Sequence, residues 1–285
     1  MKWQGRRGSR NIEDRRRSAS GGKSIGGIGG IGIIAVLIIG YALGIDVTPL
    51  LNQVAGGGSA TTQSTQITAA DEQSAQFVSV TLADTEEIWR DIFARQLGET
   101  YQPPILVLYK GVTQSPCGGA SGATGPFYCP SDNKVYLDTA FFTTMEQQLG
   151  AGGDFASAYV VAHEVAHHVQ NELGILGQAN QIRAQSSTEQ SNAISVRIEL
   201  QADCYSGIWA READIRFASL ERGDIAEALN AAKQIGDDTL ARNAGRVPQP
   251  HTFSHGTSKQ RQSWFKTGYE TGDLAACDTF SAAQL

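Results

Sequence analysis

Two histidines and a glutamate within residues 160–170 have the types and the spacing to hold and use a metal ion. His163 and His167 are one helical turn apart on a single face, so their ring nitrogens can converge on one ion. Imidazole is a common ligand of Zn²⁺, and Glu164 can take a proton from a water on that metal without binding the metal itself. The H-E-x-x-H pattern therefore predicts a zinc centre with a general base; the simpler alternative is a pair of buried structural histidines.

The residues around this motif carry the signals of a helix. Asp154 follows two glycines and provides an N-cap carboxylate, and Gly174 provides a stop after Leu173. Apolar side chains recur between them at the spacing of one helical face. His168 faces away from the pair, so we expect it not to bind the metal.

A catalytic zinc site normally has three protein ligands and one position open for water, and Glu199 is the candidate for the third ligand. Residues 187–213 have the pattern of a long helix, on which Glu199 and Asp203 share a face one turn apart. One carboxylate can bind the ion while the other hydrogen-bonds the distal nitrogen of a ligating histidine and selects its tautomer. We predict Glu199 as the ligand and Asp203 as the partner. An exchange of these roles stays open, as does an exposed acidic pair outside the site.

The remaining two histidines lie in residues 251–257, before a helix that the pattern Thr257-x-x-Gln260 predicts. If the metal centre cleaves an amide, the tetrahedral intermediate needs a hydrogen-bond donor besides the metal. His255 is the first candidate for this donor, followed by His251 and Arg261. The alternative is that these side chains only stabilise the loop or the start of the helix.

Four cysteines are present, and none is arranged as C-x-x-C. Cys117 and Cys129 flank a short Gly-rich loop, which favours their pairing and leaves Cys204 to pair with Cys277. Disulfides persist in oxidising compartments. Four free thiols, a thiolate metal site and the two other connectivities stay open.

Charge and hydropathy separate the N-terminal part from the rest of the chain. The first 23 residues hold eight Lys or Arg against two acids, although the whole chain has a net charge of −6. The acidic body argues against nucleic-acid binding. Residues 26–45 contain no charged side chain, and a helix of that length reaches about 30 Å, the thickness of the apolar layer of a bilayer.

These features predict a basic cytoplasmic arm (1–24), a transmembrane anchor (25–45), a flexible linker (46–75) and a folded domain (76–285). Basic residues that flank a span stay in the cytoplasm, so we expect a single-pass protein of the inner (cytoplasmic) membrane with its domain in the periplasm or outside the cell. A cleaved signal peptide is the alternative to the anchor. The first helix of the domain is expected to begin near Asp84 and to end at Gly98.

The pattern H-E-x-x-H followed by E-x-x-x-D is similar to that of the gluzincins, the thermolysin-type and related membrane peptidases. Five motifs that span nearly the whole chain together resemble the bacterial family of neutral zinc metallopeptidases (YpfJ-like). They are M-K-W-Q-G-R-R from residue 1, N-I-E-D-R-R from 11, H-E-V-A-H-H-V-Q from 163, E-L-Q-A-D-C from 199 and H-G-T-S from 255. The resemblance implies zinc peptidase activity, and we expect an α+β, zincin-like domain, mostly helical with a small sheet. By analogy with zincins, residues 135–138 would form an edge strand that pairs with extended substrate.

These observations together predict a membrane-anchored zinc metallopeptidase that hydrolyses a peptide or protein substrate. One Zn²⁺ per chain, held by His163, His167 and Glu199, would activate a water, with Glu164 as general base and His255 steadying the oxyanion. The alternative is a non-catalytic, membrane-anchored scaffold protein with a structural zinc. Glu164 favours the enzyme, because a structural site has no use for a base beside its ligand.

Overall fold

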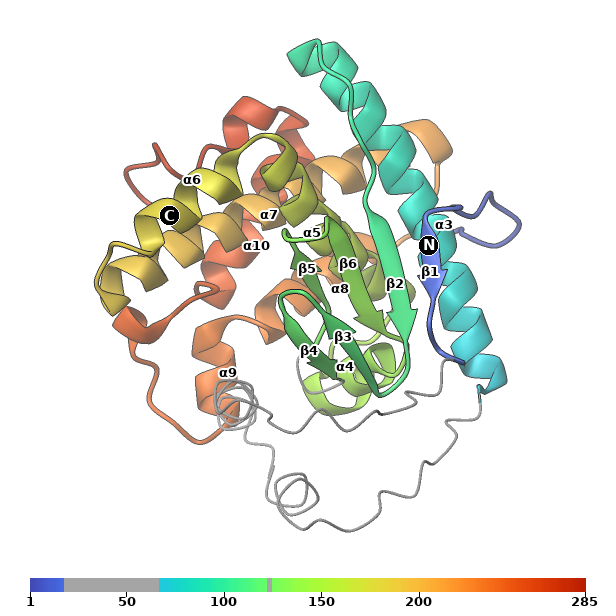
Figure 1. The fold of residues 1–285 in the computed structure, drawn as a ribbon, viewed down its shortest axis with the longest axis horizontal. Helices are drawn as coiled ribbons and strands as arrows, with labels where there is room; N and C mark the ends of the chain where they lie inside the picture. The colour runs from blue at the N-terminus through green and yellow to red at the C-terminus, as the bar shows by residue number, and fades with distance from the viewer. Residues whose placement is uncertain (18–66, 122–124) are drawn as a thin grey trace.

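The computed structural model describes residues 1–17, 67–121 and 125–285, which form an α+β domain (Figure 1). The predicted class, mostly helical with a small sheet, is confirmed. The α-helices are α3 (Ala69–Ile92), α4 (Phe141–Leu149), α5 (Asp154–Glu172), α6 (Ile175–Arg183), α7 (Thr188–Phe217), α8 (Asp224–Gln234), α9 (Asp237–Asn243) and α10 (Ser258–Thr271). Short π or 3-10 helices are Phe93–Leu97, Pro250–Thr252 and Leu274–Cys277.

A four-stranded sheet packs against α5 in the order β1 (Ile12–Asp14), β2 (Ile105–Tyr109), β6 (Lys134–Asp138), β5 (Phe127–Cys129). The first three strands are parallel, and β5 is antiparallel to β6. Because side chains alternate along a strand, Leu106 and Val135 join the main helical core while Val107 and Tyr136 form a smaller cluster. A separate hairpin is made of β3 (Val112–Ser115) and β4 (Gly118–Ser121).

The strand predicted to bind substrate is not at the edge of this sheet. β6 lies between β2 and β5, so the expectation that residues 135–138 form a free edge is wrong. In the described sheet β5 pairs with β6 alone, so β5 is the edge strand on this side and β1 is the edge strand on the other. This three-residue strand is too short to leave a periodic signal, which is why the apolar run of β6 was the more visible candidate.

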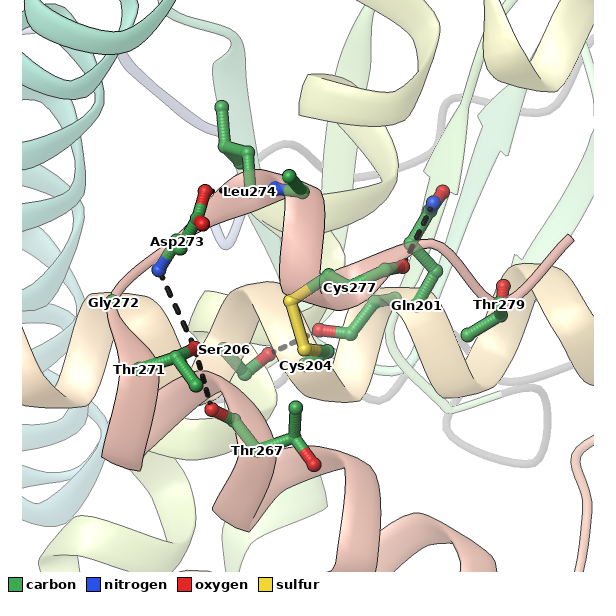
Figure 2. The surroundings of a disulfide bond; sticks show 12 residues. Gln201, Cys204, Ser206, Thr267, Thr271, Gly272, Asp273, Leu274, Cys277 and Thr279 are labelled. Atoms are coloured by element: carbon green, nitrogen blue, oxygen red, sulfur yellow. Dashed lines mark hydrogen bonds between the residues drawn. A yellow bond between two sulfur atoms is a disulfide. The ribbon is translucent and has the colours of Figure 1, made fainter. Parts of the chain in front are cut away.

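Helices α7 and α10 cross closely because each contributes a glycine to the contact. A Cβ at Gly207 would lie 2.0 Å from the carbonyl oxygen of Phe265, and a Cβ at Gly268 would lie 1.8 Å from the carbonyl oxygen of Cys204. A disulfide joins Cys204 of α7 to Cys277, in the turn that follows α10 (Figure 2). These contacts brace the helix that carries the predicted third ligand.

The other disulfide joins Cys117, beside the β3–β4 hairpin, to Cys129 of β5. The Cα atoms of this pair are 5.8 Å apart, and those of Cys204 and Cys277 are 5.6 Å apart, both within the usual range for a disulfide. This is the connectivity that the sequence favoured.

Residues 1–17, predicted as a separate arm, are part of the domain. β1 pairs with β2, with Ile12 opposite Leu106, and Arg6 donates two hydrogen bonds of 2.7 Å to the buried carboxylate of Asp84 on α3. Strands cannot pair across a bilayer, so these residues and the rest of the described domain lie on the same side of any membrane. The predicted placement of the arm on the other side of the membrane from the domain is therefore wrong for these residues. Arg6 instead serves as an ion-pair partner within the fold.

Helix α3 begins at Ala69 rather than near Asp84. Thr68 and Asp71 form a capping box in which each side chain accepts a hydrogen bond from the backbone amide of the other. Residues 69–75, predicted as linker, are consequently helical, while the predicted stop at Gly98 holds. Among the described residues no helix is both long and apolar enough to cross a membrane, and the predicted anchor at 25–45 lies outside them.

Candidate metal centre

Helix α5 presents His163 and His167 together, as their spacing predicted, with ring centroids 4.8 Å apart. The helix begins after Gly153, whose φ of 115° suits glycine, so Asp154 lies in the first turn rather than at the N-cap. It packs against α3, α7, α8 and the sheet, and most of its side chains are buried. The two imidazoles therefore project from a helix that is held on several sides. His168 instead lies near Tyr128 and the carbonyl oxygen of Gln102, away from the pair.

Glu199 approaches the two histidines from α7. One of its carboxylate oxygens lies 3.1 Å from Nε2 of His163, and the other lies 3.6 Å from Nε2 of His167. Zinc bonds of about 2.0–2.2 Å at tetrahedral angles separate ligand atoms by about 3.3–3.6 Å. Two imidazoles and one carboxylate also form a donor set that catalytic zinc uses. The three side chains, whose donor atoms all lie within 4.8 Å of one another, therefore fit this metal.

The charges of the cluster favour a cation at this position. Burial by itself lowers the pKa of His163, but the carboxylates of Asp203 and Glu199 outweigh it and raise this pKa to about 9. Burial raises the pKa of Glu199, whereas His167 and His163 pull it well below its ordinary value. Positive charge at the histidines therefore stabilises the ionised carboxylates. A proton or a divalent cation can supply this charge.

Asp203 is fully buried behind His163, with Oδ1 3.0 Å from Nδ1 of that imidazole. Its carboxylate accepts a hydrogen bond from the hydroxyl of Tyr159. Arg261 of α10 donates to both carboxylate oxygens, from Nε at 2.8 Å and from Nη2 at 3.0 Å. The two acids that the sequence left exchangeable are therefore placed differently: Glu199 faces Nε2 of both histidines, and Asp203 faces Nδ1 of one.

Arg261 and Tyr159 both hydrogen-bond the carboxylate of Asp203. Arg261 is only 2% exposed, and its guanidinium also donates to the hydroxyl oxygen of Tyr159 at 3.3 Å. Of the three candidates for an oxyanion donor, Arg261 is thus the one that is buried and already hydrogen-bonded within the protein. Sequence reasoning missed Tyr159, although its position one turn before His163 on the same helix face was a usable signal.

Glu164 shares a cleft of about 1400 Å³ with the three candidate ligands. Burial raises the pKa of Glu164 above its ordinary value, although His167 and His163 oppose the shift. A raised pKa brings a carboxylate closer to what a general base near neutral pH requires.

His255 lines the same cleft, with half of its side chain exposed. Its Nδ1 lies 3.3 Å from one oxygen of Asp237, and the other oxygen accepts hydrogen bonds of 2.7–2.9 Å from the backbone amides of residues 254–256. Asp237 therefore holds the loop and can fix the ring of His255. Sequence reasoning missed Asp237, because a loop contact between α9 and residue 255 leaves no periodic signal. His251 is exposed and is not part of the cleft wall.

The sequence model of the family described as "Putative neutral zinc metallopeptidase" matches residues 1–280. The chain belongs to this family. "Uncharacterized protein YpfJ" of Escherichia coli (strain K12) is 48% identical over 291 residues, which cover 98% of this chain and 99% of that protein. "Uncharacterized protein Rv2575" of Mycobacterium tuberculosis (strain ATCC 25618 / H37Rv) is 46% identical over 195 residues, 65% of each chain. No solved structure matches the chain. The resemblance drawn from the motifs is thereby confirmed, and the family description implies zinc.

Proposed function

We propose that this protein is a zinc-dependent peptidase that hydrolyses peptide bonds in a peptide or protein substrate. The observation that carries the proposal is the convergence of His163 Nε2, His167 Nε2 and the Glu199 carboxylate at the wall of a cleft that Glu164 also lines. A structural ion needs neither a neighbouring base nor an open cleft. Membership of the family supports the same reading.

Each side chain of the site has a role in this proposal. When bound, zinc lowers the pKa of a coordinated water and polarises the scissile carbonyl. Glu164 takes the proton of the attacking water and passes it to the leaving amine. His255, held by Asp237, donates a hydrogen bond to the developing oxyanion. The Asp203 carboxylate, 3.0 Å from Nδ1 of His163, favours a proton on that nitrogen and so leaves Nε2 for the metal position.

The cleft suits an extended chain better than a compact small molecule. Phe127 and Tyr128 of the edge strand β5 line it, together with apolar side chains such as Leu176 of α6 and Leu240 of α9. An edge strand has backbone groups that can pair with an extended peptide, while pockets between apolar side chains receive alternate residues. We infer that the substrate binds along β5, in place of the β6 edge expected from the sequence.

We also propose that the domain lies outside the cytoplasm, because its two disulfides suit an oxidising compartment. Residues 1–17 then lie outside the cytoplasm with the rest of the domain, since β1 belongs to the sheet. Attachment to a membrane through residues 25–45 stays a prediction. A single crossing between the arm and the domain does not fit the pairing of β1 with β2.

The test measures zinc content and peptide-library cleavage by the full chain and two variants. We expect about one zinc per chain in the parent and loss of that zinc in His167→Ala. Glu164→Gln should hold zinc and fold normally, while its cleavage rate falls by roughly 10²-fold to 10⁴-fold. Full zinc retention in His167→Ala would disprove the ligand assignment. Parental function of Glu164→Gln in a cell-based assay that His163→Ala abolishes would instead support a scaffold with structural zinc.

A further inference from the structure

A buried chain of hydrogen bonds runs from His167 to the disulfide-linked end of the polypeptide. Nδ1 of His167 lies 2.9 Å from Oε1 of Gln170. Nε2 of Gln170 donates to the carbonyl oxygen of Ile198 at 2.8 Å and to Oε1 of Gln201 at 2.9 Å. Nε2 of Gln201 donates to the carbonyl oxygen of Cys277 at 3.2 Å (Figure 2). Gln170 is 0% and Gln201 4% exposed, so water does not compete for these bonds.

The backbone carbonyls at the far end decide the direction of the chain. A carbonyl oxygen can only accept, so the atoms that face Ile198 and Cys277 must be amide nitrogens. Each amide then turns its oxygen toward the preceding group, and Gln170 presents an acceptor to His167. The proton of that imidazole must therefore be on Nδ1, which leaves the lone pair of Nε2 directed toward Glu199. This assignment follows from the network and does not require observed hydrogens.

We propose that Gln170 and Gln201 are positioning residues for the metal ligand His167, and that they act as an amide relay anchored on the Cys277 carbonyl. The inference rests on the proposed function, because it takes His167 as a ligand. It also gives each ligating histidine its own partner, since His163 has Asp203 on its distal nitrogen.

The chemistry of the two partners differs for an electrostatic reason. Asp203 carries a negative charge that Arg261 neutralises through two hydrogen bonds. No arginine, lysine or additional histidine is hydrogen-bonded to Gln170 in the described structure, so a carboxylate at this position would be buried without such a counter-charge. A neutral amide fixes the tautomer of His167 and adds no charge to a cluster that already contains three carboxylates.

The test compares three variants of the full chain by two measurements: the zinc dissociation constant, from competition with a chelating dye, and the melting temperature of the zinc-free protein. Gln170→Met keeps the length of the side chain and removes the acceptor, so zinc affinity should fall roughly 10-fold to 100-fold. Gln170→Glu keeps an acceptor toward His167 but turns its second oxygen against the carbonyl of Ile198. It should melt at a lower temperature than the parent yet bind zinc within roughly threefold of the parent, or more tightly.

Ser206→Ala is the matched control. Ser206 is buried on α7 near the disulfide and donates only to Ala202 of its own helix, so its loss should leave zinc affinity unchanged. If Gln170→Met fails to fold, Gln201→Asn replaces it, because the shorter side chain cannot reach both Gln170 and Cys277, and an intermediate loss of affinity is expected.

Three outcomes would overturn the proposal. Parental zinc affinity in the folded variant that lacks the acceptor would show that the relay does not position His167. If Gln170→Met and Gln170→Glu both lose zinc affinity in proportion to their loss of melting temperature, Gln170 has a role in folding alone. A parent protein that holds no zinc would overturn the proposed function itself, and the relay with it, which distinguishes that failure from the other two.

Discussion

Replacing Arg261 by methionine removes the cation that neutralises Asp203 in the interior. Arg261 is 2% exposed and Asp203 0%, and the guanidinium contacts both carboxylate oxygens, so solvent cannot replace it. Methionine retains much of the apolar volume of the arginine side chain, which limits the cavity. Removing one partner of a buried ion pair typically costs about 3–5 kcal/mol, and we expect a loss of that size in the unfolding free energy of the zinc-free protein.

The loss should depend on pH with a defined sign. In the parent, burial raises the pKa of Asp203, but Arg261 and His163 outweigh it and hold the pKa below its ordinary value. Ionised Asp203 therefore stabilises the parent above the unfolded pKa of about 3.9, and this contribution is lost as the pH falls below that value. Without Arg261, His163 alone opposes the effect of burial, so the pKa of Asp203 rises and its ionised carboxylate stabilises the fold less than in the parent as the pH rises above about 4. The difference between parent and variant should thus be large near neutral pH and smaller near pH 4.

Urea unfolding of the zinc-free proteins at pH 7.5 and 4.5 measures this difference. Arg242→Met is the control, because Arg242 pairs with Asp238 at the surface and its loss should cost less than about 1 kcal/mol. The double variant Asp203→Asn with Arg261→Met should be more stable than Arg261→Met alone, since the buried carboxylate that lost its arginine is then neutral. A loss below about 1 kcal/mol in Arg261→Met, or equal losses at both pH values, would refute the role assigned to Arg261.

Three further predictions concern stability. Replacing Cys204 and Cys277 together by serine should cost about 4 kcal/mol, from the loop entropy of a bridge with a sequence separation of 73, and unchanged urea unfolding would contradict it. Gly268→Ala should destabilise the protein by at least about 2 kcal/mol in the same assay, because its Cβ would overlap the Cys204 carbonyl; a neutral effect would mean that α7 and α10 separate easily. Burial raises the pKa of Asp71, but hydrogen bonds, the largest from Lys110, hold it well below its ordinary value, so its contribution to stability is lost as the pH falls below about 4. Asp71→Asn should show a shallower loss of stability between pH 4 and pH 2 than the parent, and parallel profiles would assign that loss to other groups.

The features that could be predicted from the sequence are those in which a short stretch of chain determines its own geometry. The H-E-x-x-H spacing places His163 and His167 on one face of α5 whatever else the helix touches. The same local rule puts Glu199 and Asp203 together on α7, and the capping box at Thr257 starts α10 where it was expected. Strands β2 and β6 were visible for a similar reason, as short apolar runs between turns.

The order of the strands and the position of the N-terminal residues were decided by contacts between distant parts of the chain. A run of apolar residues is equally compatible with an edge strand and an interior one, so the place of β6 depended on where β5 and β1 paired. Residues 1–17 are rich in arginine, as a cytoplasmic segment beside a transmembrane span would be. Only contacts such as that of Arg6 with Asp84 on α3 show that they belong to the domain.

Tertiary structure also decided which carboxylate of the metal centre faces the metal position and which one supports a histidine. Glu199 and Asp203 are chemically alike and equally placed on α7, so no local rule separates a ligand from its supporting residue. What separates them is the position of His163 on a second helix and of Arg261 on a third, which neutralises Asp203 and leaves Glu199 facing both imidazoles. A helix determines which side chains share a face, but the charge that each one meets depends on helices that are distant in the sequence.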